Sequence, residues 1–360
     1  MDYMSAKETA EKWNISQRRV AILCSENRIP GATMVGNMWI IPTDVKKPED
    51  ARTTRFLHDS TLPVKPFVKW AGGKAQIIEK IRHGYPFGLG KTITKYAEPF
   101  VGGGAVLFDV LSKYQLEEVY ISDINRELIE TYTQIRENAD ELISVLSTFE
   151  CEYLPLSDDE RKDYYYTKRK QFNALKVNAA TGVEIAALFI YLNRTCFNGL
   201  YRVNSKGGFN VPMGSYKNPT ICDSDNLLAV SMKLQGVKIV CGDYKESGTF
   251  IDDKTFAYFD PPYRPLSVTS SFTSYAQDGF DDDKQVELAY FIKEMSRKGA
   301  FVVASNSDPK NADESDNFFD NLYNTLSIVR ISAIRAINSV GAGRGHINEL
   351  LISNCGGIRE

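Results

Sequence analysis

The segment that most restricts how this chain can fold is a short apolar run, Thr255–Phe259, with the tetrapeptide Asp260-Pro261-Pro262-Tyr263 directly after it. A brief run of this kind is typical of a strand that is buried on both faces of a parallel sheet. The two prolines end the strand and stiffen the loop that follows. Ligands of open α/β sheets bind at the carboxyl ends of the strands. The sequence therefore predicts an α/β sheet with a binding site at Asp260.

The tetrapeptide also offers a particular chemistry, because it places a carboxylate, a fixed carbonyl and an aromatic ring around one small space. Asp260 and the carbonyl of Pro261 can accept the two N–H bonds of an amino group, and Tyr263 can stack on a flat heterocycle. We therefore expect Asp260, Pro261 and Tyr263 to be catalytic. The alternative is a strand-ending turn in which Asp260 is an ordinary cap.

The pattern from Pro66 onward is that of an α/β domain. Seven apolar segments are predicted to be strands, at residues 93–98, 118–122, 237–241, 255–259, 299–305, 326–334 and 347–353. Residues 125–190 are mostly helical in pattern. We expect one sheet domain, residues 66–124 and 237–360, interrupted by a helical insertion at residues 125–236.

Residues 1–45 are predicted to form a separate small domain that begins with two helices. Ser5 starts the capping box of the first helix, and Ser16 caps the second, which carries Arg18 and Arg19. A short hairpin is predicted next, with strands near 33–35 and 38–41.

The order of these elements resembles a winged helix-turn-helix of the MerR or excisionase type. Such a module would place its second helix in a DNA major groove. A protein-interaction role is the alternative. Residues 46–65 are polar and poor in apolar side chains, and we interpret them as a linker.

Composition favours a globular protein, because 43% of the residues are hydrophobic and 25% are charged. No apolar stretch approaches the length of a membrane span, and the first residues lack a signal-peptide core. The six cysteines form no Cys-x-x-Cys pair, and the three histidines are far apart, which argues against disulfides and zinc. We expect a cytoplasmic protein with no membrane association and no metal.

A glycine-rich loop, Gly102-Gly103-Gly104, is predicted to follow one strand, and Asp123 ends the next. Glycines let a ligand approach the backbone, and an acid at this position can accept ribose hydroxyls. The loop is not Gly-x-Gly-x-x-Gly and no P-loop lysine follows it, so a dinucleotide or a triphosphate fits poorly. The loop fits a cofactor with one adenosine and no pyrophosphate, such as S-adenosylmethionine, unless the glycines serve packing alone.

Positive charge is concentrated in one segment. Residues 161–217 hold ten Lys and Arg against two acidic residues, although the whole chain has a net charge of −3. The segment also contains many Tyr, Phe and Asn. This pattern indicates a polyanion partner such as nucleic acid, and a solvated charged face is the alternative.

Five motifs occur in one order along the chain. They are Lys69-Trp-Ala-Gly-Gly-Lys74, Glu98-Pro-Phe-Val-Gly-Gly-Gly104, Ser122-Asp-Ile-Asn125, Asn193-Arg-Thr-Cys-Phe-Asn-Gly-Leu-Tyr-Arg202 with Gly208-Phe-Asn-Val-Pro212, and Asp260-Pro-Pro-Tyr263. Together they closely resemble the Dam-type, or alpha-group, DNA adenine-N6 methyltransferases. The resemblance runs from about Pro66 to Asn354.

The resemblance implies a Rossmann-like fold for an S-adenosylmethionine-dependent methyltransferase, with a helical DNA-recognition insertion. Trp70 and Lys74 would hold the methionine part of the cofactor, and Asp123 would hold its ribose. The complete set of expected cofactor contacts is Trp70, Lys74, Phe100, Gly102, Gly104, Asp123, Asp243 and Asp260. Asp243 would lie near the cofactor's adenine.

DNA contacts are implied at Lys69, Asn198, Leu200, Arg202 and Pro212, in addition to those expected of Arg18 and Arg19. Phe197 stands where relatives often carry Tyr, so a hydroxyl contact is lost there. Arginine pairs bidentately with guanine, and the resemblance implies that Arg202 reads the guanine of a 5′-GA site, such as GATC.

We therefore expect a site-specific, adenine-specific DNA methyltransferase that flips its target base out of duplex DNA and releases S-adenosylhomocysteine. A restriction endonuclease acting on the same site is a candidate partner, and a monomer or a weak dimer is expected. Three alternatives stay open. They are amino methylation of RNA or protein, an inactive DNA-binding regulator, and a nicotinamide dehydrogenase.

Overall fold

The computed structural model describes residues 3–13, 20–21, 23–24, 29–36, 38–47, 64–264, 280–334 and 346–355. The chain divides into two compact units, Met1–Leu62 and Pro63–Glu360. No helix among the described residues is long and apolar enough to cross a membrane. Each unit is described by itself below.

The first unit contains a helix and a three-stranded antiparallel sheet. Helix α1 (Ala6–Trp13) begins with the predicted capping box, since Ser5 N donates to Glu8 Oε2 at 2.7 Å and Glu8 N donates to Ser5 Oγ at 3.2 Å. The sheet has the order β1-β3-β2 and consists of β1 (Tyr3–Ser5), β2 (Thr33–Val35) and β3 (Met38–Pro42). The predicted helix and hairpin are confirmed. Strand β1 was not predicted, because three residues are too few to display an alternation of polar and apolar side chains.

The predicted second helix of this unit lies largely outside the described residues, and so do Arg18 and Arg19. Val20, Ala21, Leu23 and Cys24 are described and helical, and Val20, Leu23 and Cys24 are buried in the core of the unit. The winged helix-turn-helix therefore stays a prediction.

The second unit is built on a seven-stranded sheet, and all seven predicted strands are confirmed. The sheet has the order β6-β5-β4-β7-β8-β10-β9. Its strands are β4 (Lys95–Glu98), β5 (Glu118–Asp123), β6 (Lys238–Cys241), β7 (Thr255–Phe259), β8 (Phe301–Ser307), β9 (Ser327–Ile334) and β10 (His346–Ser353). The first five strands in this order are parallel, whereas β10 is antiparallel to both of its neighbours.

Strands β4 and β7 lie side by side at the point where the chain changes direction across the sheet. From β4 the chain proceeds to β5 and β6 on one side, and from β7 it proceeds to β8 on the other. The loops that follow β4 and β7 therefore stand at the position where open α/β sheets bind their ligands. Both motif loops, Glu98–Gly104 and Asp260–Tyr263, leave their strands there.

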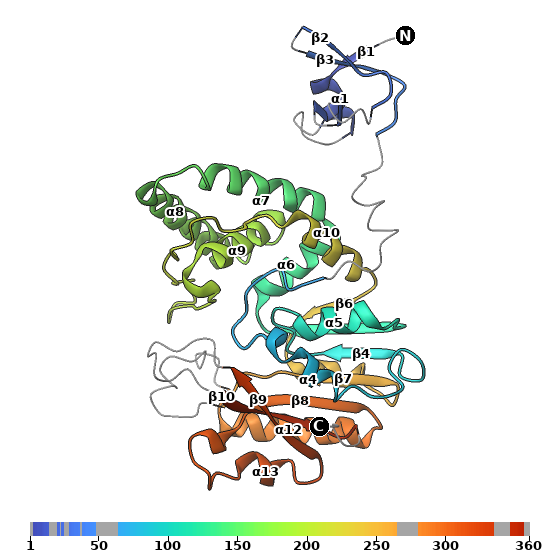
Figure 1. Cartoon of the computed structure of the whole chain (residues 1–360), viewed down its shortest axis with the longest axis vertical. Helices are drawn as coiled ribbons and strands as arrows, with labels where there is room; N and C mark the ends of the chain where they lie inside the picture. Colours follow the sequence, from blue (N-terminus) through green and yellow to red (C-terminus); the bar gives the residue numbers. More distant parts are fainter. Residues whose placement is uncertain are drawn as a thin grey trace. The chain divides into compact units, whose positions relative to one another are not determined.

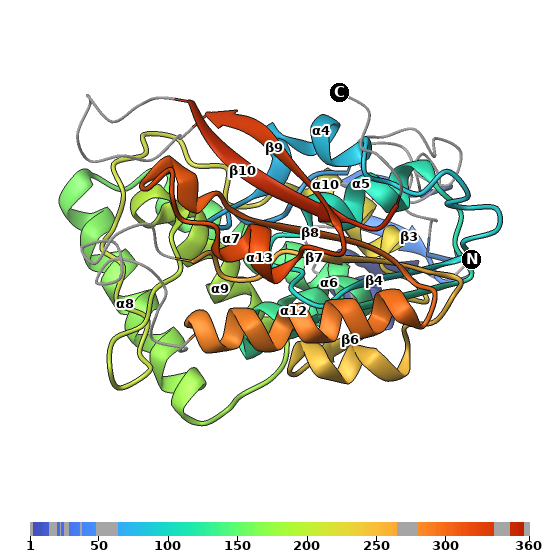
Figure 2. The same cartoon turned by 90° about the horizontal axis from the view of Figure 1, so that it is seen from below.

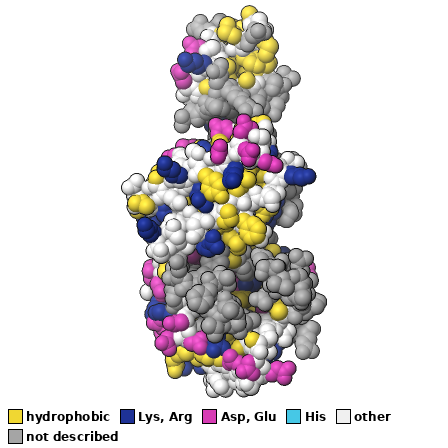
Figure 3. Space-filling model, turned by 90° about the vertical axis from the view of Figure 1, so that its left-hand side faces the viewer, with side chains coloured by type: hydrophobic (Ala, Val, Ile, Leu, Met, Phe, Trp, Pro, Cys, Tyr) yellow, Lys and Arg dark blue, Asp and Glu magenta, His cyan; other side chains and the backbone are white. Residues whose placement is uncertain are grey.

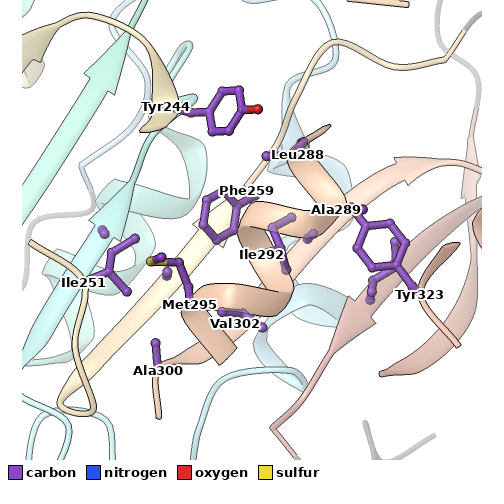
Figure 4. Close-up of a cluster of buried hydrophobic side chains, with 14 of the residues drawn as sticks. Tyr244, Ile251, Phe259, Leu288, Ala289, Ile292, Met295, Ala300, Val302 and Tyr323 are labelled. Carbon is purple, nitrogen blue, oxygen red and sulfur yellow. The ribbon is translucent and has the colours of Figure 1, made fainter. Parts of the chain in front are cut away.

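Helix α12 (Asp282–Arg297) covers one face of the sheet beside β7 and β8 (Figure 2). Figure 4 shows the cluster of buried side chains beneath it, with Phe259 from β7 and Val302 from β8 against Leu288 and Ile292 of the helix. These four side chains are completely buried. Their burial fixes the strand whose end carries Asp260.

The helical insertion lies on the β6 side of the sheet (Figure 1), and its first helix packs against β5 and β6. Its helices are α6 (Arg126–Glu137), α7 (Ala139–Tyr153), α8 (Asp158–Val177), α9 (Val183–Thr195) and α10 (Ser224–Lys233). Helix α9 is apolar over most of its surface, and α6, α7 and α8 all pack against it. The glycine loop is followed by helix α5 (Ala105–Lys113).

Candidate active site

Asp260, at the carboxyl end of β7, forms an ion pair with Lys74, whose Nζ is 2.9 Å from Asp260 Oδ1. The Lys74 side chain is only 4% exposed. Its ammonium also donates to the carbonyl of Gly72 and lies 4.6 Å from the centroid of the Tyr263 ring. A buried ammonium needs such acceptors. The structure therefore joins Lys74, a predicted cofactor residue, to two of the predicted catalytic residues.

Burial raises the pKa of Asp260 to about 6, because a carboxylate that is poorly exposed to water is poorly solvated. The Lys74 ammonium opposes this shift, and the nearby Glu349 carboxylate adds to it. Burial also raises the pKa of Glu98, at the end of β4, well above its ordinary range. Asp260 and Glu98 are thus two carboxyl groups at this edge whose charged forms are destabilised by burial.

The loop after Asp260 is held from two sides. The Tyr263 hydroxyl donates to Glu349 Oε2 on β10 at 2.7 Å, and Gln285 on α12 donates to the carbonyl of Pro262 at 2.9 Å. Among the described residues no group donates to the carbonyl of Pro261. That carbonyl therefore lies beside Asp260 with its acceptor capacity unused by this part of the protein.

The glycine loop packs tightly against Trp70. A Cβ atom on Gly102 would lie 2.7 Å from the Trp70 ring, and one on Gly104 would lie 2.5 Å from the Tyr132 hydroxyl. Gly102 and Gly104 also have positive φ angles of 47° and 75°. Packing alone therefore requires these two glycines, whatever ligand the loop approaches.

Asp123 follows β5 and faces the same loop. Its carboxylate accepts from the backbone N–H of Gly102 at 3.1 Å and from that of Asn125 at 2.9 Å. Asn125 in turn caps α6 by accepting from Leu128 N. The next side chain, Ile124, is large and apolar and yet 68% exposed. A carboxylate beside an exposed apolar surface suits a sugar attached to a flat ring.

Phe100 and Asp243 lie at the same edge, on the side of β6. The Phe100 ring stacks on Tyr244, with centroids 5.4 Å apart, and meets Phe280 edge-on. Asp243 is exposed and caps a short 3-10 helix, η3 (Tyr244–Thr249), by accepting from Lys245 N. Gly242 N donates to the carbonyl of Asp123, which brings the Asp243 loop next to the predicted ribose site.

The predicted DNA-contacting residues of the second unit lie on the insertion, apart from Lys69, which bonds to it through Asn193. Lys69, Asn198, Arg202 and Pro212 are exposed, and Leu200 is half-buried. Asn198 has a φ of 55° within η2 (Phe197–Gly199), a conformation that Asn tolerates better than most residues.

Arg202 lies on a small hairpin opposite Asn210. Its Nε donates to Asn210 Oδ1 at 2.7 Å, and Asn210 N donates to the carbonyl of Arg202 at 3.0 Å. These bonds orient one edge of the guanidinium group. Among the described residues none accepts from its two terminal nitrogens.

Among the described residues, only Lys176 of the basic segment pairs with an acidic side chain, so most of the positive charge of the segment is not neutralised. Six of its ten cations have partners within the protein. Arg161, Arg169 and Arg194 donate to backbone carbonyls, Arg202 donates to Asn210, Lys168 lies over the Phe149 ring and Lys176 pairs with Glu127. The other four are exposed, namely Lys162, Lys170, Lys206 and Lys217, and Arg202 is exposed as well. Figure 3 shows Lys and Arg side chains among hydrophobic ones in the middle of the view, at the height of α7–α9.

Four further residues take part in the site but were not predicted from the sequence. Glu349 holds Tyr263, Ile124 lies beside Asp123, Tyr201 stacks on Trp70, and Asn210 orients Arg202. Ile124, Tyr201 and Asn210 lie inside the motifs that carried the resemblance, so their position was a usable signal. Glu349 had none, since no motif surrounds it.

Comparisons with known proteins agree with this geometry. The model of the family "D12 class N6 adenine-specific DNA methyltransferase" matches residues 70–337. The chain is 49% identical over 295 residues to the type II methyltransferase M.MjaIII of Methanocaldococcus jannaschii, which covers 81% of this chain and 100% of that protein. It is 37% identical to the type II methyltransferase M1.LlaDCHI of Lactococcus lactis, over 84% of this chain and 99% of that protein. It is 32% identical to a DNA adenine methylase of Escherichia coli, over 80% of this chain and 94% of that protein.

Proposed function

Since the chain belongs to the D12 class of N6 adenine-specific DNA methyltransferases, we propose that it transfers the methyl group of S-adenosylmethionine to adenine through the residues around Asp260. The observation that carries this proposal is the position of Asp260. It lies where the strand order reverses, next to the ring of Tyr263 and to the carbonyl of Pro261, which accepts no hydrogen bond from the described residues, and it is paired with a buried lysine.

The residues at the carboxyl edge fit an S-adenosyl cofactor. Asp123 would accept the ribose hydroxyls, and the exposed face of Ile124 would be covered by the adenine ring. Phe100 and Asp243 border the same place, and Trp70 and the glycine loop would line the methionine end. When bound, the cofactor supplies an electrophilic methyl group on a sulfonium.

Asp260 and Pro261 would orient the target amine. The adenine amine is a poor nucleophile because its lone pair is delocalised into the ring. Acceptance of its two N–H bonds by Asp260 Oδ and the Pro261 carbonyl would draw the nitrogen toward tetrahedral geometry. Lys74 favours the ionised form of Asp260, which is the better acceptor. Tyr263 would stack on the base and offset part of the few kcal/mol that base flipping costs.

The exposed face of the insertion would read the DNA. Arg202, oriented by Asn210, has the geometry for a bidentate contact to guanine, which predicts a 5′-GA site such as GATC. Asn198, Leu200 and Pro212 would border the neighbouring bases, and Lys69 would contact the DNA from the cofactor side.

The first unit would add DNA affinity without supplying chemistry. The family match begins at Trp70, so this unit is an addition to the methyltransferase. We further propose a winged helix-turn-helix with Arg18 and Arg19 on its reading helix. Two relatives are named type II methyltransferases, which makes a restriction endonuclease of the same specificity a candidate partner. We expect a monomer or a weak dimer.

Transfer of a labelled methyl group tests the proposal. The full chain is incubated with labelled S-adenosylmethionine and a mixed-sequence duplex, and N6-methyladenine is quantified after digestion. Asp260→Ala should abolish transfer because the amine loses its acceptor. Asp252→Ala is the matched control, since Asp252 precedes the same strand at its other end and also pairs with a lysine, Lys95, at 2.8 Å. Activity of Asp260→Ala within tenfold of the control would contradict the role of Asp260.

A further inference from the structure

The segment that leads into the cofactor motif is attached to the helical insertion at every second residue. We call residues 65–69 the strap. Asn226 on α10 bonds both the N–H and the carbonyl of Lys65 at 3.0 Å. Arg194 donates to the carbonyl of Phe67 at 2.8 Å. Asn193 on α9 bonds both the N–H and the carbonyl of Lys69 at 2.8 Å. Side chains of the insertion thus form the hydrogen bonds to the backbone of the strap that a neighbouring strand would form.

Asn193 makes one contact that Asn226 does not. Its second amide hydrogen is donated to the carbonyl of Gly199 at 2.9 Å. Gly199 belongs to the segment that carries Asn198 and Arg202, and a Cβ atom on Gly199 would lie 2.6 Å from the Lys69 side chain. Two residues farther on, Tyr201 stacks on Trp70 with centroids 5.8 Å apart. The strap and residues 198–202, which carry Asn198 and Arg202, are therefore both bonded to the buried side-chain amide of Asn193.

We propose that Asn193 is a positioning residue that fixes Arg202 relative to Trp70 and Lys74, and so makes base discrimination depend on one buried side chain. The inference rests on the proposed function. Asn193 is 4% exposed, and its removal would leave the N–H and carbonyl of Lys69 and the carbonyl of Gly199 without this partner. Buried polar groups that lose a partner shift to find another, which would move the backbone next to Arg202.

Asn226 provides a matched control. It is 7% exposed, comes from the same insertion, and forms the same pair of bonds with a strap residue four positions earlier. Among the described residues, none of its hydrogen bonds reaches residues 198–202. A purely structural role for the two asparagines predicts the same consequences for both.

The experiment compares Asn193→Ala, Asn226→Ala, Arg202→Ala and the double variant Asn193→Ala/Arg202→Ala. The parent's preferred site is first mapped by sequencing modified adenines. Discrimination is then the ratio of kcat/KM for a duplex with that site to kcat/KM for a duplex with a changed base pair before the target adenine. Asn193→Ala should lower the ratio about tenfold. Asn226→Ala should leave it within about twofold.

In the double variant, loss of Asn193 should not lower the ratio below that of Arg202→Ala alone, because Asn193 acts through Arg202. Equal ratios for Asn193→Ala and Asn226→Ala, or additive losses in the double variant, would overturn the proposal. If Asn193→Ala does not fold, Asn193→Asp keeps the size and the acceptor for Lys69 N but loses the donor to the carbonyls of Lys69 and Gly199, and it should show the same loss. A parent protein that transfers no methyl group would instead contradict the proposed function.

Discussion

The ammonium of Lys74 influences how well Asp260 can accept hydrogen bonds near neutral pH. Asp260 has a pKa of about 6 in the folded protein, above its ordinary value of 3.8. A raised carboxyl pKa means that the folded state binds more protons than the unfolded state between these values. The free energy of unfolding should therefore fall as the pH rises from about 4 to about 6, and then level off.

The first prediction concerns the pH dependence of methyl transfer. The ionised form of Asp260 is the active acceptor, so kcat/KM for the cofactor should decrease as the pH falls below about 6. A plot of log kcat/KM against pH should rise there with a slope of one, because one proton is lost. Lys74→Met should move this limb to higher pH, because the lysine lowers the pKa of Asp260. The assignment of this pH dependence to Asp260 would be contradicted if the activity of the parent fell only below pH 5, or if the activity of Lys74→Met fell at a lower pH than that of the parent.

The second prediction concerns the bond between Tyr263 and Glu349. Tyr263→Phe and Glu349→Ala should each slow single-turnover transfer, by roughly tenfold or less. The double variant should be no slower than the slower single variant, because the two residues share one hydrogen bond. Glu349→Ala should also shift the acid limb to lower pH, since Glu349 raises the pKa of Asp260. Additive losses would show that the residues act separately.

Among single residues, the sequence predicted those that lie in motifs but not the residues to which they are hydrogen-bonded. Asp260, Lys74 and Asp123 could be selected because each lies in a short motif, and Asp260 and Asp123 also stand at the ends of predicted strands. Glu349 and Asn193 could not be assigned partners, because their contacts lie 86 and 124 residues away along the chain. A single sequence gives no signal for pairing at such distances.

Among the elements, the hairpin that carries Arg202 determines the expected specificity. The third prediction is that Arg202→Ala lowers the preference for guanine before the target adenine about tenfold, while methylation of the remaining sites persists. Asn210→Ala should lower the preference less, because it loosens the guanidinium group without removing it. A uniform loss on all sequences would indicate that Arg202 contacts phosphate.

The strands were predictable as elements because each is an apolar run between polar turns, and β7 is buried at every residue. The glycine loop was predicted in its place but not in its contacts. The space that a Cβ atom of Gly102 or Gly104 would need is occupied by Trp70 and Tyr132. These two residues come from segments before and after the loop in the sequence. Packing between distant segments therefore explains more of this loop than the motif alone indicated.

At the scale of the whole molecule, the fourth prediction concerns the two units. Removal of residues 1–62 should leave methyl transfer and its site preference intact, because the family match begins at Trp70. It should raise the DNA concentration needed and flatten the salt dependence, by about one unit of slope per lost phosphate contact. DNA titrations at several salt concentrations measure both. Unchanged affinity and slope would leave the first unit without a DNA role on these duplexes, and a protein partner would become the better explanation.

The position of β10 has a consequence for how the protein is made. Strand β10 follows β9 in the chain, yet it lies between β8 and β9 in the sheet. During synthesis β9 therefore leaves the ribosome before the strand that connects it to the sheet exists. Until residues 346–353 arrive, β8 keeps an open edge and Tyr263 lacks its bond to Glu349. A nascent chain should consequently rely on its last strand both to close the sheet against aggregation and to complete the methyl-transfer site.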